Sequence, residues 1–264
     1  MLYEKIYLRE DRQDVYLECY CYHESEKSKS ILVIPGGGYG FVSDREGEPI
    51  AKVFGEKGFN CFVLQYSINE NSVYPNPLLD AALAMKHIRQ NADKYHVLTD
   101  KVFAVGFSAG GHLCGMLGNM WYRDEISALA QTTPDVIRPT GVMLIYPVIT
   151  AFSHTHQGTI DHITGGDHSE EALLNISIEK HISSKSVPAF LVHTAADATV
   201  DVENAIFAAS AYSQAKVPFE MHIFPFGPHG LALGNSVTSG NNPIMEDTEF
   251  AKWPELATAW INRF

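Results

Sequence analysis

The sequence predicts an α/β fold built on a mostly parallel, twisted sheet with helices on both of its faces. Continuous apolar runs that end in glycine or small polar residues recur along the chain, as in "SILVIPGG" and "KVFAVGFS". Such runs are typical of strands that are buried on both faces. Helical patterns fill the gaps between them, and this alternation implies parallel strands joined by right-handed crossovers.

Length and composition favour one large domain, which we expect to span residues 1–264 with a sizeable core. Hydrophobic residues make up 45% of the chain and charged residues 19%. Acidic residues outnumber basic residues 31 to 19, which gives a net charge of -12. This charge argues against nucleic acid or an anionic membrane surface as the main partner. The sequence leaves open whether the chain forms a homo-oligomer.

The elements follow in a regular order. Polar and apolar residues alternate in 4–9 and 14–22, which predicts an antiparallel hairpin at the start. Buried strands are predicted for 30–37, 59–67, 101–108, 140–147 and 188–195, and a strand over 219–227 closes the series. Helices are predicted for 48–58, 76–95, 108–122, 201–216 and 250–264.

The segment 150–187 breaks this alternation. It is polar and rich in histidine, and a connection of this length is usually functional or mobile. We interpret it as a small cap over the carboxyl ends of the strands. Its histidines raise the hypothesis of a metal site, but no cysteine or carboxylate completes a recognisable zinc spacing. We therefore predict no metal; the histidines concerned are His154, His156, His162 and His168.

The first residues, "MLYEKIYLRED", contain no basic region followed by an apolar stretch, so no secretory signal is predicted. No window approaches the ~18 to 20 apolar residues of a membrane span. The four cysteines form no known redox spacing and are interpreted as reduced packing thiols. These observations lead us to expect a cytoplasmic protein.

The strongest motif is Gly106-Phe107-Ser108-Ala109-Gly110, which matches G-x-S-x-G. It follows a predicted buried strand and opens a predicted helix, which is the context that a nucleophile elbow requires. A sharp strand-to-helix turn forces the serine into a strained conformation, and the glycines let the two elements approach. Ser108 is therefore the candidate nucleophile.

A serine hydroxyl needs a base, and the base needs a carboxylate that orients it. His229 lies in the loop after the last predicted strand, and Asp197 lies just beyond the strand before it. Asp201 and Glu203 are rival acids further along, in the start of the following helix. The chain order of serine, acid and histidine is that of α/β-hydrolases. We therefore predict an α/β-hydrolase fold with Ser108, Asp197 and His229 as its triad.

The glycine run "VIPGGGYGF" ends the first buried strand and suits an oxyanion hole. Glycines let backbone N–H groups turn toward a negative oxygen, and the N–H of Ala109 supplies a further donor. A phosphate-binding interpretation is weaker, because the P-loop Lys-Ser/Thr is absent. Tyr39, Phe41 and His112 are candidates for the lining of the substrate pocket.

Other polar residues have less specific interpretations. Arg45 and Glu46 either form an ion pair that fixes the glycine loop, contact a polar substrate, or form a solvated pair. Asp80 is expected to face solvent or to cap a local turn. His193 and His222 fall inside predicted strands and are interpreted as packed or edge residues.

Together, "PGGGY", "REGEPIA", "YPNPLLDAALA", "GFSAGGHL", "YPVIT", "HTAAD" and "FGPHGL" resemble the α/β-hydrolase esterases grouped with acetyl-xylan esterases and feruloyl-esterase-like or "sugar hydrolase" proteins. The similarity runs from about residue 30 to 235. It implies hydrolysis of small acyl esters, often acetyl groups on xylan-derived sugars. Carried over by position, it implies Gly37, Gly38 and Ala109 as the oxyanion donors, beside the same triad.

The expected function is thus that of a serine carboxylic-ester hydrolase that acts on a small-molecule or oligosaccharide ester through an acyl-enzyme, without a cofactor. One alternative is a peptidase-, formamidase- or thioesterase-type acyl hydrolase on the same triad. The other is a non-catalytic binding protein that keeps the fold.

Overall fold

A computed structural model describes residues 1–264, and an eight-stranded sheet runs through it in the order β1-β2-β4-β3-β5-β6-β7-β8. The strands are β1 (Leu2–Tyr7), β2 (Tyr16–Cys21), β3 (Ser28–Ile34), β4 (Asn60–Gln65), β5 (Val97–Phe107), β6 (Val142–Ile145), β7 (Ala189–Thr194) and β8 (Phe219–Phe224). β1 and β2 pair antiparallel, β2 pairs antiparallel with β4, and all other neighbours are parallel. The predicted opening hairpin and the mostly parallel sheet are both confirmed.

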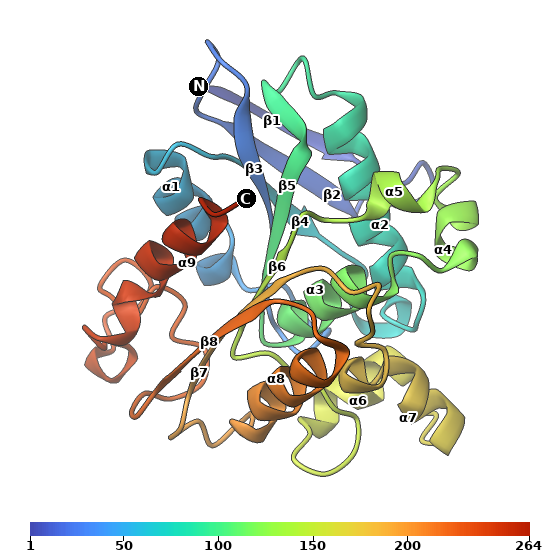
Figure 1. Ribbon diagram of the computed structural model, residues 1–264, viewed down its shortest axis with the longest axis vertical. Helices are drawn as coiled ribbons and strands as arrows, with labels where there is room; N and C mark the ends of the chain where they lie inside the picture. The colour runs from blue at the N-terminus through green and yellow to red at the C-terminus, as the bar shows by residue number, and fades with distance from the viewer.

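Helices cover both faces of the sheet (Figure 1). They are α1 (Glu48–Glu56), α2 (Asn76–Gln90), α3 (Ala109–Met120), α4 (Asp124–Leu129), α5 (Pro134–Ile137), α6 (Gln157–Thr164), α7 (Glu170–Ile176), α8 (Glu203–Ala215) and α9 (Trp253–Ile261). α1 and α9 lie on one side of the sheet, and α2, α3 and α8 lie on the other. The sequence pattern did not predict α4 and α5.

The central strands are buried on both faces, as their continuous apolar runs predict. In β5, Val102 and Ala104 join the larger core cluster, which holds 46 buried residues on the α2–α3 side. Phe103 and Val105 point the other way, into the cluster of 24 residues beneath α1 and α9. Since successive side chains of a strand alternate between faces, both layers of helices pack on the same strands.

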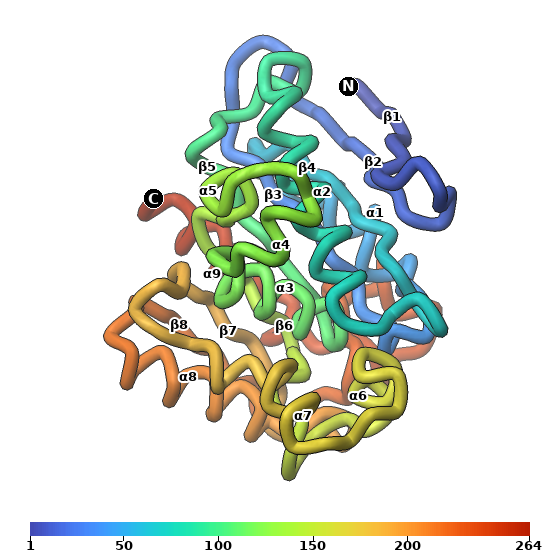
Figure 2. The backbone as a smooth tube through the Cα atoms, turned by 90° about the vertical axis from the view of Figure 1, so that its right-hand side faces the viewer, coloured from blue at the N-terminus to red at the C-terminus, as the bar shows by residue number.

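The insertion at 150–187 folds as α6, α7 and the short 3₁₀ helix η3 (Ile178–Lys180). Figure 2 shows α6 and α7 together at one end of the molecule. Ile160, Ile163 and Ile176 anchor the insertion to the larger core cluster. The insertion is therefore packed onto the body of the protein through an apolar base, and its histidines are left for the polar side.

Asp80 neither faces solvent nor caps a local turn, so both parts of the expectation are wrong. It is fully buried on α2, where its Oδ1 lies 2.8 Å from Nε of Arg9 and its Oδ2 accepts the backbone N–H of Ser67 at 2.8 Å. Burial raises the pKa of Asp80 despite these partners. The carboxylate connects α2 to the N-terminal segment and to Ser67, just after the end of β4. These contacts join parts of the chain that are far apart in sequence.

The four cysteines are all buried and unpaired. None of the helices is both long enough and apolar enough to span a bilayer.

Candidate active site

Ser108 sits at the turn between β5 and α3, in a backbone conformation that side chains rarely adopt (φ 53°, ψ -119°). The turn is tight enough to require glycine on both sides. A Cβ on Gly106 would lie 2.2 Å from the carbonyl oxygen of Gly110, and a Cβ on Gly110 would lie 2.2 Å from that of Ile34. The strained serine and its small neighbours are the features of a nucleophile elbow.

His229 joins Ser108 to Asp197 in one hydrogen-bonded row. Its Nε2 lies 2.8 Å from Oγ of Ser108, and its Nδ1 lies 2.7 Å from Oδ2 of Asp197. A carboxylate only accepts, so Nδ1 carries the proton and Nε2 offers its lone pair to the serine hydroxyl. This is the tautomer in which the imidazole can act as a base toward Ser108.

Asp197 is held as an anion. Its side chain is 1% exposed, and burial alone would raise its pKa. Hydrogen bonds from His193 and His229 and from the backbone N–H of Val200 outweigh burial and keep the pKa of Asp197 well below its usual range. The other oxygen, Oδ1, accepts the N–H groups of Thr199 and Val200 at 2.9 and 3.0 Å. A permanently ionised Asp197 can stabilise a charged His229.

His193 also contacts the carboxylate of Asp197. It is fully buried in β7, as expected of a packed residue, and its Nε2 lies 2.9 Å from the carbonyl oxygen of Val200 and 3.4 Å from Oδ2 of Asp197. Its position in a strand predicted burial, but only the folded loop of 197–200 shows its contact with the acid.

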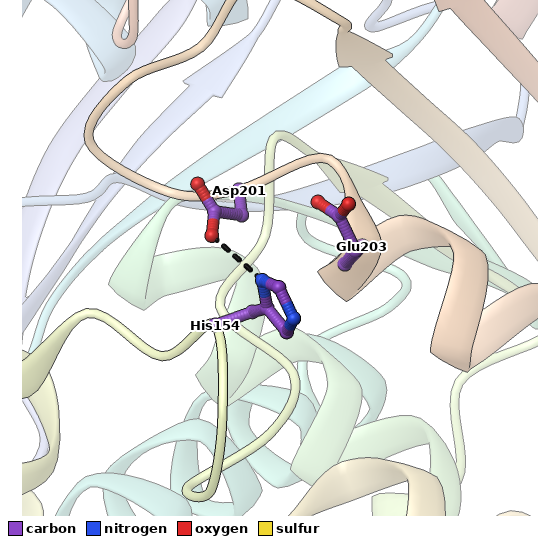
Figure 3. Close-up of side chains that lie close together, drawn as sticks. All are labelled: His154, Asp201 and Glu203. Atoms are coloured by element: carbon purple, nitrogen blue, oxygen red, sulfur yellow. Dashed lines mark hydrogen bonds and ion pairs between the residues drawn. The ribbon is translucent and has the colours of Figure 1, made fainter.

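The rival acids Asp201 and Glu203 lie apart from this row. Figure 3 shows them grouped with His154, whose Nδ1 is 2.8 Å from Oδ2 of Asp201. One ligand atom from each of the three side chains falls within 4.8 Å of the others, a grouping that could hold a cation. His154 and Asp201 are 42% and 48% exposed and pair with each other. Neither acid contacts His229, so they do not replace Asp197.

The glycine loop after β3 has unpaired backbone donors in the cavity that Ser108 also lines. The N–H groups of Gly37 and Gly38 donate to no protein acceptor, and both residues line a cavity of about 270 Å³ together with Ser108. Their φ angles are 127° and 62°, and a Cβ on Gly37 would lie 2.1 Å from the carbonyl oxygen of Phe41. The N–H of Ala109 begins the first turn of α3, where N–H groups lack intrahelical acceptors. This donor set suits a developing oxyanion.

Most of the side chains that line the cavity belong to polar residues. Besides those two glycines and Ser108, its walls are formed by Phe41, Ser43, Arg45, Glu46, His156, Thr199, His229 and Gly230. Phe41, which is 61% exposed, is the one predicted pocket residue that the structure places in this lining.

Tyr39 and His112 do not line the cavity, and this part of the expectation is corrected. Both are fully buried, and the Tyr39 hydroxyl lies 2.9 Å from Nδ1 of His112. Nε2 of His112 donates to the carbonyl oxygen of Ile176 at 2.8 Å, so Nδ1 accepts from Tyr39. Burial lowers the pKa of His112 to about 4. The pair joins the glycine loop, α3 and the end of α7. The burial of Tyr39 and His112 therefore depends on Ile176, which lies far away in sequence.

Arg45 and Glu46 do not pair with each other; each fixes a loop of the site. Glu46 is buried, and its Oε2 accepts the N–H of Gly36 at 2.8 Å, beside the glycine donors. Arg45 donates to the carbonyl oxygens of Gly230 and Thr238 at 2.8 and 2.5 Å. The short segment 45–46 thereby holds both the glycine loop and the loop that carries His229.

His156 is a cavity residue that the sequence singled out only as part of a histidine-rich segment. Its Nδ1 accepts the backbone N–H of Thr159 at 3.3 Å and lies 2.8 Å from the Thr159 hydroxyl. The proton therefore resides on Nε2, for which the protein provides no partner. Burial, reinforced by the nearby His229, lowers the pKa of His156. At neutral pH the cavity thus contains one further neutral N–H donor.

Comparison with known proteins identifies the family of the chain. Residues 14–211 match the model of the BD-FAE family. The chain belongs to the BD-FAE family. It is 37% identical over 90% of its length to endo-1,4-beta-xylanase B of Butyrivibrio fibrisolvens, and 26% identical over 80% of its length to the acetylxylan esterase of Xylanibacter ruminicola. The BD-FAE chain spans only 38% and 42% of the length of these two relatives.

Among solved structures, the acetyl ester-xyloside bifunctional hydrolase from Caldicellulosiruptor lactoaceticus is similar over nearly the whole of both chains. It shares 30% identity with the BD-FAE chain, with a TM-score of 0.84, and the match covers 98% of this chain and 96% of that one. The structural neighbours confirm the α/β-hydrolase fold. The resemblance read from the sequence motifs is also confirmed, and the BD-FAE chain falls within a family of carboxylic-ester hydrolases.

Proposed function

We propose that this chain hydrolyses small acyl esters, in particular acetyl esters of xylan-type carbohydrates, through an acyl-enzyme on Ser108. The observation that carries the proposal is the row Ser108–His229–Asp197, with contacts of 2.8 and 2.7 Å, at a cavity that also contains unpaired backbone donors. A nucleophile, an oriented base and an oxyanion site in one place are the three requirements of acyl transfer.

In the first half of the reaction, Nε2 of His229 takes the proton of the Ser108 hydroxyl while Oγ attacks the ester carbonyl carbon. The carbonyl oxygen becomes an oxyanion on the N–H groups of Gly37, Gly38 and Ala109. The bond to the alcohol oxygen then breaks, and His229 returns its proton to the leaving alcohol. Asp197 stays ionised throughout and stabilises the imidazolium.

In the second half, a water molecule takes the place of the alcohol. His229 removes one proton from the water, the resulting hydroxide attacks the acyl carbon, and the bond to Oγ of Ser108 breaks. The proton on His229 passes to Oγ, and the carboxylic acid leaves. The enzyme returns to its starting state, and no cofactor takes part in either half.

Two observations support a short acyl group on a polar alcohol. The volume of the cavity is only about 270 Å³, and Phe41 is one of its lining residues. Its other side chains are mostly polar, and His156 adds an N–H donor that suits a hydroxyl or ester oxygen. The names of two relatives, an acetylxylan esterase and an acetyl ester-xyloside hydrolase, support the same substrate class.

The test compares nitrophenyl acetate, butyrate and octanoate with acetylated xylo-oligosaccharides, each with the wild type and Ser108→Ala. We expect kcat/KM to fall as the acyl chain lengthens and acetylated sugars to be turned over faster than the longer simple esters. Sugar turnover no faster than octanoate turnover would contradict the carbohydrate assignment. An aminoacyl anilide and an acyl thioester complete the series, and preference for either would favour a peptidase or a thioesterase instead.

A further inference from the structure

A second hollow, larger than the catalytic cavity, opens on the sheet face formed by β1, β2 and β4. Its volume is about 700 Å³. We call it the tyrosine groove, because Tyr3, Tyr16 and Tyr20 line it, together with three carboxylates and with Met1, Ser43, Gly47, Val63 and Gln65. The carboxylates are those of Glu18, Asp44 and Glu48.

The groove exists because the sheet is wider than the helices that cover it. α1 packs against β2, β3 and β4, and β1 lies beyond it at the edge of the sheet (Figure 2). Tyr3 pairs with Tyr20 and Glu18 with Val63 across the strands, so these side chains share one face. Val63 is buried with α1 in the smaller core cluster, whereas Tyr3 is 51% exposed. This face of the sheet is therefore buried beneath α1 at Val63 and open to solvent at Tyr3, on the edge strand.

The aromatic rings of the groove are fixed rather than free. The ring centroids of Tyr3 and Tyr20 lie 5.2 Å apart, and the Tyr3 hydroxyl donates to Oε1 of Glu18 at 2.9 Å. Nζ of Lys5 lies 3.2 Å from the centroid of Tyr16 and occupies one face of that ring. Tyr3 therefore supplies the main open aromatic surface, already held in place before any ligand arrives.

The charges of the groove restrict its ligand. Three carboxylates line the groove, while the Met1 ammonium there pairs with Glu24 and Lys5 lies on Tyr16. The remaining negative charge disfavours anionic ligands such as phosphates, nucleic acid and acidic polysaccharides. The same carboxylates accept hydrogen bonds from hydroxyl groups. A neutral pyranose combines apolar C–H faces, which pack on an aromatic ring, with a rim of hydroxyl donors. This combination matches aromatic rings that have carboxylate acceptors beside them.

The groove also meets the catalytic cavity. Ser43 lines both, Asp44 lines the groove, and Arg45 and Glu46 line the cavity. One turn of 3₁₀ helix, η1 (Asp44–Glu46), thus separates the two. The strand register places Tyr3 level with Phe103, which is five residues before Ser108 and four strands away. At about 3.3 Å per residue and about 4.8 Å per strand, Tyr3 and Ser108 lie roughly 25 Å apart, so a chain of several units is needed to occupy both.

We propose that the tyrosine groove binds unsubstituted, neutral pyranose units of the same oligosaccharide whose acetyl group enters the catalytic cavity. The proposal rests on the proposed function only in its choice of a carbohydrate substrate. It predicts that saccharide binding in the groove is separable from ester hydrolysis at Ser108. The groove should therefore bind a saccharide that carries no ester.

The binding test uses Ser108→Ala protein and unsubstituted xylohexaose, measured by titration calorimetry. We expect Tyr3→Ala to weaken binding at least tenfold, and Tyr3→Phe, which keeps the ring, to weaken it less than threefold. Tyr7→Ala is the matched control, because Tyr7 is 52% exposed on the same face of β1 but does not line the groove. It should leave the affinity unchanged. Circular dichroism melting curves check that each variant is folded.

The kinetic test uses otherwise wild-type protein. Tyr3→Ala should raise KM for acetylated xylohexaose at least fivefold and leave kcat/KM for nitrophenyl acetate unchanged. The proposal is overturned if xylohexaose does not bind, or if Tyr3→Ala and Tyr7→Ala weaken its binding equally. It is also overturned if sedimentation shows a dimer that Tyr3→Ala dissociates. A wild type that binds xylohexaose but releases no acetate from any sugar contradicts the proposed function while the groove assignment stands.

Discussion

The hydroxyl of Tyr146 donates to Oε1 of the buried Glu46 at 2.7 Å and accepts the backbone N–H of Ala232 at 2.9 Å. Glu46 in turn accepts the N–H of Gly36 at 2.8 Å. One buried pair therefore links the glycine loop, which carries the proposed oxyanion donors, to the segment that follows His229. The ring of Tyr146 also contacts His229, with the ring centroids 5.1 Å apart. The glycine loop and the loop that carries His229 are thus held by a single network.

This network predicts the effect of Tyr146→Phe. The change leaves an oxygen of Glu46 and the N–H of Ala232 without their partner, which costs about 1–3 kcal/mol for a buried group. We expect kcat/KM for nitrophenyl acetate to fall about tenfold, with most of the loss in kcat. Tyr212→Phe is the control, since Tyr212 is also buried and bonded, to Asn119, but lies outside the site. Loss of stability in both variants with equal loss of kcat would contradict a positioning role for Tyr146.

Gly37→Ala tests the oxyanion loop. The new Cβ would lie 2.1 Å from the carbonyl oxygen of Phe41 at a φ of 127°, so the loop must move. Losing an oxyanion donor costs roughly 10²–10³ in kcat, and we expect a loss in this range. Gly58→Ala is the matched control: its φ is 98° and nothing lies within 4 Å of the added Cβ. It should lower the melting temperature and leave kcat unchanged, whereas a normal kcat for Gly37→Ala would remove this loop from the mechanism.

The depressed pKa of Asp197 predicts both a kinetic and a stability effect. Because its folded pKa lies below its unfolded value, the ionised carboxylate stabilises the fold above the ordinary Asp range near ~4. This contribution is lost as the pH falls through the lower, folded pKa. Asp197→Asn should reduce kcat by roughly 10⁴, since the wrong tautomer of His229 is then favoured.

The difference in unfolding free energy between wild type and Asp197→Asn, from urea titrations, should be constant from pH 7 to 5 and shrink below about pH 4. A difference that grows with acidity would contradict the assigned direction of the pKa shift.

The pKa of His112 is also lowered, but for histidine a lowered pKa means that the fold disfavours the charged form. Burial lowers its pKa from 6.5 to about 4. The unfolded chain therefore takes up a proton below about pH 6.5 that the folded chain takes up only near pH 4, so stability falls across this window.

His112→Gln removes that titration. We expect the variant to be less stable than the wild type at pH 7 and to lose less stability between pH 6.5 and 4, as measured by urea unfolding. Equal slopes for the two proteins would show that His112 is not kept neutral by the fold.

The sequence selected Ser108, Asp197 and His229 from local context alone. Ser108 is recognised by its strand, its glycines and its helix, which are all neighbours in sequence. His229 and Asp197 follow the carboxyl ends of successive strands, and parallel strands bring such ends to one edge of a sheet. The structure brings all three together at hydrogen-bonding distance.

The residues that were misplaced depend on contacts between distant segments. Tyr39 and His112 are drawn inward because Ile176, at the end of the insertion, offers a carbonyl oxygen. Asp80 is buried because Arg9 and Ser67 reach it from other elements. Periodicity and turn signals describe neighbours along the chain, so they do not report which distant donors satisfy a buried acceptor.

The most direct test of the central claim is covalent labelling of Ser108. A fluorophosphonate probe reacts only with a serine that its base has activated, and peptide mass spectrometry locates the adduct. We predict a single adduct on Ser108 in the wild type, none in Ser108→Ala, and strongly reduced labelling in His229→Ala. Labelling of a different serine, or full esterase activity in Ser108→Ala, would contradict the account.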